Sequence, residues 1–355
     1  MKTCCTIMSA LFLAGVCGLA IGAEENVNVW KHNSDWFRDA KWGVFTHYMA
    51  DTVIKGEEIT VAKWNAAVDS FDVAAFAERL ATIGAGYSII TLGQNSGYYC
   101  SPNATYDKYV GIAPSKCSKR DLVADLYDAL HGKGIRLMVY LPSGAPDRDE
   151  VARTALEWQN GKYPLWSHPD GGPDGGDRRL EAFQRKWEAV IREWSTRWGS
   201  KVSGWWFDGC YFPHAMYYHP DPPNFESFAA ATRAGNPDGI VAFNPGVRYP
   251  IVTVTPFEDY AAGEINEPER VACTGRWVEG EHGAKAQYHM LSYLGPSWAQ
   301  SPPRFSNEQA VAFTRGIVEK GGVVSWDVPI LANGAIPEPF LVQLKVIGEA
   351  MAAAK

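Results

Sequence analysis

Asp208 is the residue of this sequence best placed to do chemistry. It ends the run Gly204-Trp205-Trp206-Phe207-Asp208, where residues 202–207 are short and rich in aromatic side chains and predict a buried strand. Gly209 then lets the chain turn beside the carboxylate. In barrels of alternating strands and helices, the C-terminal ends of the strands line the active site. The position therefore predicts a catalytic acid, with the capping of a loop as the alternative.

The elements around Asp208 predict such a barrel. Helical periodicity is expected at residues 71–83, 119–133, 178–198, 224–234, 307–320 and 340–351. Strands are expected at residues 42–45, 87–92, 135–141, 202–207, 239–243, 288–293 and 323–326, with a further one leading from residues 251–257 to an end near 258–264. Eight strands that mostly alternate with helices indicate an α/β fold, a single-domain (β/α)8 TIM-type barrel over residues 24–355.

Polar side chains follow many of these strands and are expected to face one mouth. They are His47, Gln94, Asn95, Asp208, Asn244, Glu264, His289 and Asp327. Amides, imidazoles and carboxylates without a metal or phosphate motif suit a neutral polyhydroxylated ligand such as a sugar. Aromatic side chains add flat apolar surfaces for sugar rings, and the candidates are Trp64, Tyr98, Trp206 and Trp298. Backbone partners inside a barrel could instead satisfy any one of the amides or imidazoles.

Cleavage of a glycosidic bond needs a second carboxyl group beside Asp208. The candidates are Glu258, Glu264, Glu267, Glu281 and Asp327. Glu264 is favoured as the acid/base because Gly263 precedes it and its segment follows a strand, whereas Glu258 and Asp259 suit a solvated loop. Asp327 is next because it also follows a strand. A separation near 5 Å between the two carboxyl groups would imply retention of configuration, and a wider gap inversion.

The composition limits the partners of this protein. The chain has 355 residues, of which 46% are hydrophobic, and a net charge of -7, which argues against a nucleic-acid partner. No CxxC or HxxxH spacing occurs, so neither a metal nor a cofactor is expected. Asp170, Asp174 and Asp177 lie among glycines and could hold calcium, although a solvated loop is the favoured interpretation. The sequence leaves the oligomeric state open.

The first residues predict export. Lys2 precedes an apolar stretch at residues 7–19 and small residues near 20–23, so residues 1–23 are expected to be a cleaved signal peptide and the mature protein to be secreted or periplasmic. The apolar stretch is too short to span a membrane. Export permits disulfides, and Cys100 and Cys117 could close one loop.

Two segments resemble a known family. Residues 36–48, Trp-Phe-Arg-Asp-Ala-Lys-Trp-Gly-Val-Phe-Thr-His-Tyr, are similar to the opening barrel strand of the family 29 glycoside hydrolases, the α-L-fucosidases. Trp206-Phe207-Asp208-Gly209 resembles the strand that bears their nucleophile, and Arg120-Asp121-Leu122 resembles the entry to their second barrel helix. The resemblance implies an exo-acting, retaining glycosidase with Asp208 as nucleophile and His47 on sugar hydroxyls.

The chain also departs from that family. Residues 92–97, Leu-Gly-Gln-Asn-Ser-Gly, stand where the family usually carries histidines, Tyr288-His289 replaces a Trp-Glu element, and no C-terminal β-sandwich is evident. The prediction is therefore a secreted glycoside hydrolase that acts on a glycan, releasing a terminal α-L-fucose or a related sugar with retention. Two alternatives stay open, a barrel that binds a glycan without cleaving it and an inverting glycosidase.

Overall fold

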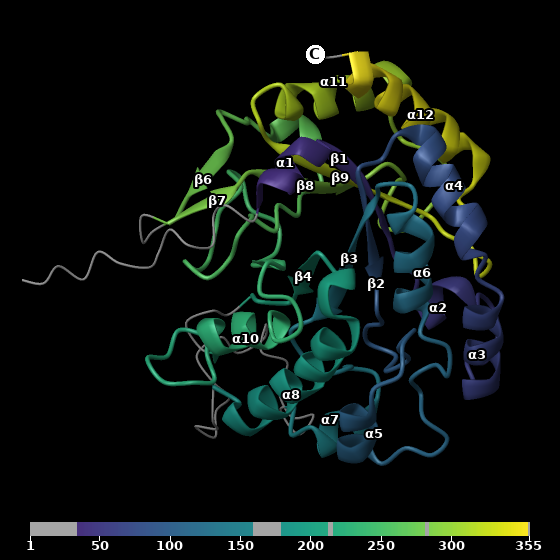
Figure 1. The fold of residues 1–355 in the computed structure, drawn as a ribbon, viewed down its shortest axis with the longest axis vertical. Coiled ribbons are helices and arrows are strands. Elements are labelled where there is room, and N and C mark those ends of the chain that lie inside the picture. Colours follow the sequence, from purple (N-terminus) through teal and green to yellow (C-terminus); the bar gives the residue numbers. More distant parts are fainter. Residues whose placement is uncertain (1–33, 159–178, 212–215, 281–283, 354–355) are drawn as a thin grey trace, which may run out of the picture.

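A curved sheet of seven parallel strands forms the centre of the protein (Figure 1). The computed structural model describes residues 34–158, 179–211, 216–280 and 284–353. In spatial order the strands are β5 (Ile240–Phe243), β4 (Gly204–Asp208), β3 (Arg136–Pro142), β2 (Tyr87–Thr91), β1 (Trp42–Thr46), β9 (Val323–Val328) and β8 (His289–Tyr293). The α/β barrel-type fold predicted from the sequence is confirmed.

The position between β5 and β8 holds an irregular segment in place of the expected eighth strand. Residues 259–265 bridge the two strands: the amide of Asp259 donates to the carbonyl of Val241 at 2.9 Å, and the amide of Leu291 donates to the carbonyl of Gly263 at 2.8 Å. The strand expected to lead from residues 251–257 is wrong, since those residues form no strand. Strand pairing alone therefore does not close the barrel.

Gly263 explains part of this irregularity. Its φ of 65° lies in the left-handed region, and a Cβ at this position would lie 1.9 Å from the carbonyl oxygen of His289. Only glycine fits so close to β8, so the chain bends immediately before Glu264.

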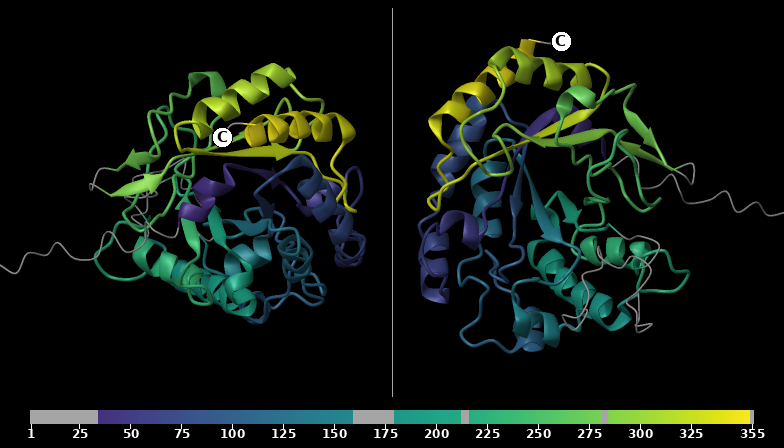
Figure 2. Two further views of the ribbon diagram at one scale, coloured as in Figure 1. Left: turned by 45° about the horizontal axis from the view of Figure 1, so that its top comes forward. Right: turned by 180° about the vertical axis from the view of Figure 1, so that it is seen from behind.

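The helices cover the outer face of the sheet (Figures 1 and 2). The six predicted helices are present as α4 (Val73–Ile83), α6 (Leu122–His131), α8 (Glu181–Trp198), α10 (Phe225–Thr232), α11 (Asn307–Val318) and α12 (Glu338–Ala353), and α1 (Asp35–Ala40) precedes β1. The sequence did not predict α2 (Ala50–Val53), α3 (Val61–Asp69), α5 (Ala104–Val110), α7 (Glu150–Ala155), or the antiparallel hairpin of β6 (Trp277–Glu279) and β7 (Lys285–Gln287).

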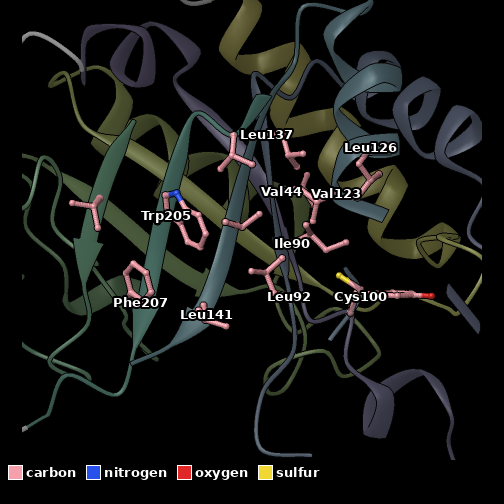
Figure 3. Packing of buried hydrophobic residues seen from close by; sticks show 14 of the residues in the cluster. Val44, Ile90, Leu92, Cys100, Val123, Leu126, Leu137, Leu141, Trp205 and Phe207 are labelled. Atoms are coloured by element: carbon pink, nitrogen blue, oxygen red, sulfur yellow. The ribbon is translucent and has the colours of Figure 1, made fainter. Parts of the chain in front are cut away.

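Alternating side chains of the strands build two apolar layers. Trp205 and Phe207 of β4 point outward toward the helices (Figure 3), where the ring of Phe207 lies 4.8 Å from that of Phe228 in α10. Trp206, between them, belongs to the cluster inside the barrel together with Phe45 and Tyr140. Each large side chain buried in this way contributes roughly 1.5–3 kcal/mol. The two layers hold the end of β4, and with it Asp208, in place.

The four cysteines of the described residues, Cys100, Cys117, Cys210 and Cys273, are buried and free. The disulfide suggested for Cys100 and Cys117 is therefore not formed. The thiol of Cys100 donates to the carbonyl oxygen of Thr91 at 3.5 Å.

Some predictions fall on residues that the structure does not describe. These are the signal peptide at residues 1–23, the glycine-rich loop at 170–177 and the candidate Glu281. Within the described ranges, no helix combines the length and apolar character needed to cross a membrane.

Candidate active site

Four hydrogen-bond donors surround the carboxylate of Asp208, which is the last residue of β4. Oδ1 accepts from the amide of Gly209 at 2.8 Å, from Nδ2 of Asn244 at 2.9 Å and from the hydroxyl of Tyr211 at 3.2 Å. Oδ2 accepts from the hydroxyl of Tyr140 at 2.6 Å. These donors fix the orientation of the carboxylate.

Asn244 brings Glu264 next to Asp208. Its buried side-chain amide Nδ2 also donates to Oε2 of Glu264, at 2.5 Å. One nitrogen thus contacts both carboxyl groups, and Oδ1 of Asp208 and Oε2 of Glu264 lie no farther apart than the sum of 2.9 Å and 2.5 Å, about 5.4 Å. The structure brings together the two carboxyl groups that the sequence paired.

The surroundings of Glu264 favour its protonated form. Burial, followed by the negative charge of Asp208, raises its pKa from 4.5 to about 7, against the opposing effects of Asn244 and His47. A carboxyl group that holds its proton near neutral pH can act as a general acid. The site therefore contains an acid close to a carboxylate that is held by four donors.

His47 and Asp327 form a second polar pair in the mouth. Nδ1 of His47 lies 2.7 Å from Oδ1 of Asp327, whose Oδ2 accepts from the amide of Ala299 at 2.6 Å. Asp327 is buried within β9, and the sequence had placed it after the strand. Because both of its oxygens are engaged, Asp327 orients His47 and the chain at Ala299, and Glu264 is better placed to act as the acid/base. With Nδ1 on Asp327, the other ring nitrogen of His47 is left for a substrate.

Other predicted side chains lie around these pairs. Nε2 of Gln94 donates to the hydroxyl of Tyr140 at 2.5 Å, and Asn95, next to it, is half-buried. Half-buried Trp298 has its ring 5.6 Å from that of His47, a position suited to a sugar ring.

Trp206 and Tyr98 lie deeper than the sequence suggested. Trp206 is 2% exposed and stacks on Tyr140 at a centroid distance of 5.3 Å. Tyr98 is 8% exposed, and its hydroxyl donates to the carbonyl of Ile59 at 3.2 Å. Trp206 thus supports the floor of the site from below.

The structure places His289 and Trp64 in the core, which corrects their expected contact with substrate. Nε2 of His289 bonds Ser325 at 2.8 Å and Nδ1 lies 3.1 Å from the carbonyl oxygen of Ala261, while burial lowers its pKa to about 4. The indole nitrogen of Trp64 donates to the carbonyl oxygen of Tyr99 at 3.0 Å. Both side chains are fully buried, because backbone and hydroxyl groups inside the protein satisfy their polar atoms.

The sequence did not predict the contacts that Tyr140 and Tyr211 make with Asp208. Tyr140 lies inside the predicted third strand, where strand alternation could have identified it as a side chain that points into the barrel near its mouth. Tyr211 follows the turn after β4, and its sequence context carried no signal of a role.

Buried acids anchor the irregular segment that carries Glu264. Oδ2 of Asp259 accepts from Arg233 at 2.5 Å and from the amide of Val241 at 2.8 Å. Oε1 of Glu258 accepts from the amide of Thr255 at 3.2 Å. Burial raises the pKa of Glu258 to about 8 and that of Asp259 to about 6, the latter against the charge of Arg233. The expectation that these acids lie in a solvated loop is wrong, because both are buried. Their carboxylates accept from backbone amides that a regular strand would otherwise pair.

The described residues contain no cluster of three or more side chains suited to a metal ion. A cavity of about 430 Å³ opens beside the starts of β1 and β3, at the end of the barrel opposite Asp208, and its lining includes Trp36, Lys41 and Arg136. Its lining includes one carboxyl group, that of Asp39, whereas the mouth holds the pair of Asp208 and Glu264.

An α/β barrel that carries two carboxyl groups at this spacing in its mouth has the architecture of a glycoside hydrolase. The model of one family, described as alpha-L-fucosidase, matches residues 61–354. The chain belongs to the α-L-fucosidase family. No protein among the curated sequences matches it.

Solved structures share its fold at low sequence identity. The endo-fucoidan hydrolase MfFcnA4 of glycoside hydrolase family 107 is 17% identical with a TM-score of 0.69, over 91% of this chain and 54% of that one. The α-L-fucosidase AlfC of Lactobacillus casei, in complex with α-L-fucose, is 16% identical with a TM-score of 0.60, over 91% of this chain and 98% of that one. The chain thus spans about half the length of the first structure, and these likenesses show the fold alone.

Proposed function

We propose that this protein hydrolyses a terminal α-L-fucoside, or the glycoside of a closely related sugar, with retention of configuration. Asp208 is the nucleophile and Glu264 the acid/base. The observation that carries the proposal is the bridge made by Asn244, which keeps one oxygen of each carboxyl group within about 5.4 Å of the other. Retaining glycosidases separate these groups by about 5–5.5 Å, and inverting ones by about 6.5–9.5 Å.

The reaction follows from the two environments. Asp208 attacks the anomeric carbon while Glu264 gives its proton to the leaving oxygen, and the sugar becomes an ester of Asp208. Esterification removes the negative charge that helps to raise the pKa of Glu264. The pKa of Glu264 then falls, so its carboxylate accepts a proton from the water that attacks the ester in the second step.

Polar groups at the mouth supply contacts for a sugar. The ring nitrogen of His47 that does not face Asp327 is suited to a hydroxyl group, and Trp298 offers an apolar face. Membership of the α-L-fucosidase family supports fucose as the sugar. The signal-like residues 1–23 support export, which would bring the enzyme to extracellular glycans.

Proton NMR during hydrolysis of an aryl α-L-fucoside tests the proposal. We expect α-L-fucose as the first-formed anomer, followed by slow mutarotation. First formation of the β anomer would favour the inverting alternative. An absence of turnover on aryl α-L-fucosides and α-L-galactosides, combined with glycan binding, would favour a barrel that binds without cleaving.

A further inference from the structure

The two oxygens of Asp208 have different surroundings. Oδ1 accepts three hydrogen bonds, of 2.8, 2.9 and 3.2 Å. Oδ2 accepts one, from the hydroxyl of Tyr140 at 2.6 Å. An ionised carboxyl group has about four acceptor sites, two on each oxygen. Counting donors from the described residues, Oδ1 is therefore saturated, whereas Oδ2 keeps a free electron pair.

We propose that Oδ2 is the atom of Asp208 that attacks the sugar, and that Tyr140 is a further catalytic residue, which stabilises Oδ2 when the sugar leaves in the second step. Gln94 is the positioning residue for Tyr140. This inference rests on the proposed retaining function and assigns the oxygen that carries it out.

The electrons and protons of the two steps balance on these atoms. In the first step, an electron pair of Oδ2 forms the bond to the anomeric carbon, the bond to the aglycone oxygen breaks, and Glu264 protonates that oxygen. Oδ1 becomes the ester carbonyl and keeps its three donors. In the second step, water bonds to the anomeric carbon, its proton passes to Glu264, and the electron pair of the breaking bond returns to Oδ2.

The surroundings of Tyr140 hold its hydroxyl in place as a donor. Its oxygen accepts from Nε2 of Gln94 at 2.5 Å, and its ring stacks on Trp206 with 17° between the ring planes. The side chain is 1% exposed, and burial, followed by the charge of Asp208, raises the pKa of its hydroxyl. The phenol is neutral, and its proton is directed to Oδ2.

The hydrogen bond from Tyr140 acts unequally on the two steps. An ester oxygen is a weak acceptor, and negative charge develops on Oδ2 as the sugar departs, so this bond strengthens toward the second transition state. In the first step it is strongest in the ground state, because Oδ2 loses charge on attack. Loss of the hydroxyl should therefore slow the second step specifically.

Tyr140→Phe tests the inference because it keeps the ring on Trp206. With an aryl α-L-fucoside that has a good leaving group, we expect kcat to fall about 10- to 100-fold, as for loss of a hydrogen bond to a charged group. We expect kcat/KM to change less than about threefold, because it reports the first step. KM should fall, and an initial burst of nitrophenol should appear as the glycosyl-enzyme accumulates.

Tyr211→Phe is the matched control on the same carboxylate. It removes the 3.2 Å bond to Oδ1, which accepts both in the free carboxylate and in the ester, so kcat and kcat/KM should change by similar, small factors and without a burst. Gln94→Met removes the donor to Tyr140. As in Tyr140→Phe, kcat should fall more than kcat/KM, but the difference between the two should be smaller. This second variant still tests the role of Tyr140 if Tyr140→Phe does not fold.

Equal falls in kcat and kcat/KM without a burst, in Tyr140→Phe or in Gln94→Met, would overturn the role of Tyr140 while leaving retention intact. A wild-type protein that releases no nitrophenol from any fucoside, or that forms the β anomer first, would overturn the proposed function, and this inference with it.

Discussion

The two carboxyl groups of the site lie on different kinds of backbone. Asp208 ends a regular strand that pairs with β3 and β5 in the parallel sheet. Glu264 lies on the irregular segment 259–265, which buried acids attach to β5. The regular strand gives the carboxylate of Asp208 a fixed direction. The irregular segment places an acid where burial and a neighbouring charge raise its pKa.

Removal of Asp208, the proposed nucleophile, should produce the largest effect. In Asp208→Gly we expect turnover of aryl α-L-fucosides to fall on the order of 10³-fold or more, because no group remains to form the ester. Azide should restore part of the turnover by entering the space of the lost carboxylate, and the release of nitrophenol measures both effects. Asp238→Gly, an exposed acid before β5, is the control and should retain wild-type turnover. A fully active Asp208→Gly would remove Asp208 from the mechanism.

Removal of the acid should have a smaller effect that depends on the leaving group. In Glu264→Gln we expect kcat/KM to fall about 10²- to 10⁴-fold for sugar leaving groups and much less for nitrophenol, which departs with little protonation. In the wild type, Glu264 must be protonated, so kcat/KM should decline as pH rises through about 7, and this limb should vanish in the variant. A pH profile that keeps the limb would assign it to another group.

The irregular segment should depend on its buried ion pair. Arg233→Met leaves Asp259 buried and unpaired, and we expect a loss of about 3–5 kcal/mol in the free energy of unfolding, measured in urea. Arg270→Met, which removes an exposed pair with Glu267, is the matched control and should shift the midpoint little. If the two variants unfold alike, the anchoring role of Asp259 is wrong.

Glu258 should give the smallest effect, one that depends on pH. Its pKa is raised from 4.5 to about 8 in the folded protein, so between these values the folded state binds more protons and stability falls as pH rises. Glu258→Gln removes this term. Its free energy of unfolding relative to wild type should therefore increase between pH 5 and pH 8, by on the order of 3 kcal/mol. A difference independent of pH would show that Glu258 is charged in the fold.

The sequence could predict the regular strand that carries Asp208 but not the irregular segment that carries Glu264. The strand of Asp208 was predictable because a short aromatic run bounded by glycines leaves few alternatives. The irregular segment 259–265, which stands in place of a strand between β5 and β8, was not predictable. The side chains of Glu258 and Asp259 there replace the backbone partners of a regular strand, and this substitution leaves no periodic pattern in the sequence. The placement of Glu264 beside Asp208 was still predicted, through the glycine that precedes Glu264.

The predicted site residues also fall into two groups, those that lie at the mouth and those that lie in the core. His47 and Asn244 lie beside carboxyl groups of the mouth, where their positions after strands predicted them. His289 was misassigned because, although it stands in a predicted strand, its two nitrogens are used inside the barrel. Only three-dimensional packing distinguishes a polar side chain that faces the mouth from one that is satisfied within the core.

Covalent trapping tests the central claim most directly. A 2-deoxy-2-fluoro fucoside with a good leaving group slows both steps by destabilising the positively charged transition states, so the glycosyl-enzyme persists. After proteolysis, mass spectrometry should find one sugar on the peptide that contains Asp208. A label on another carboxylate, such as Glu264, or an active enzyme that is never labelled, would contradict the account.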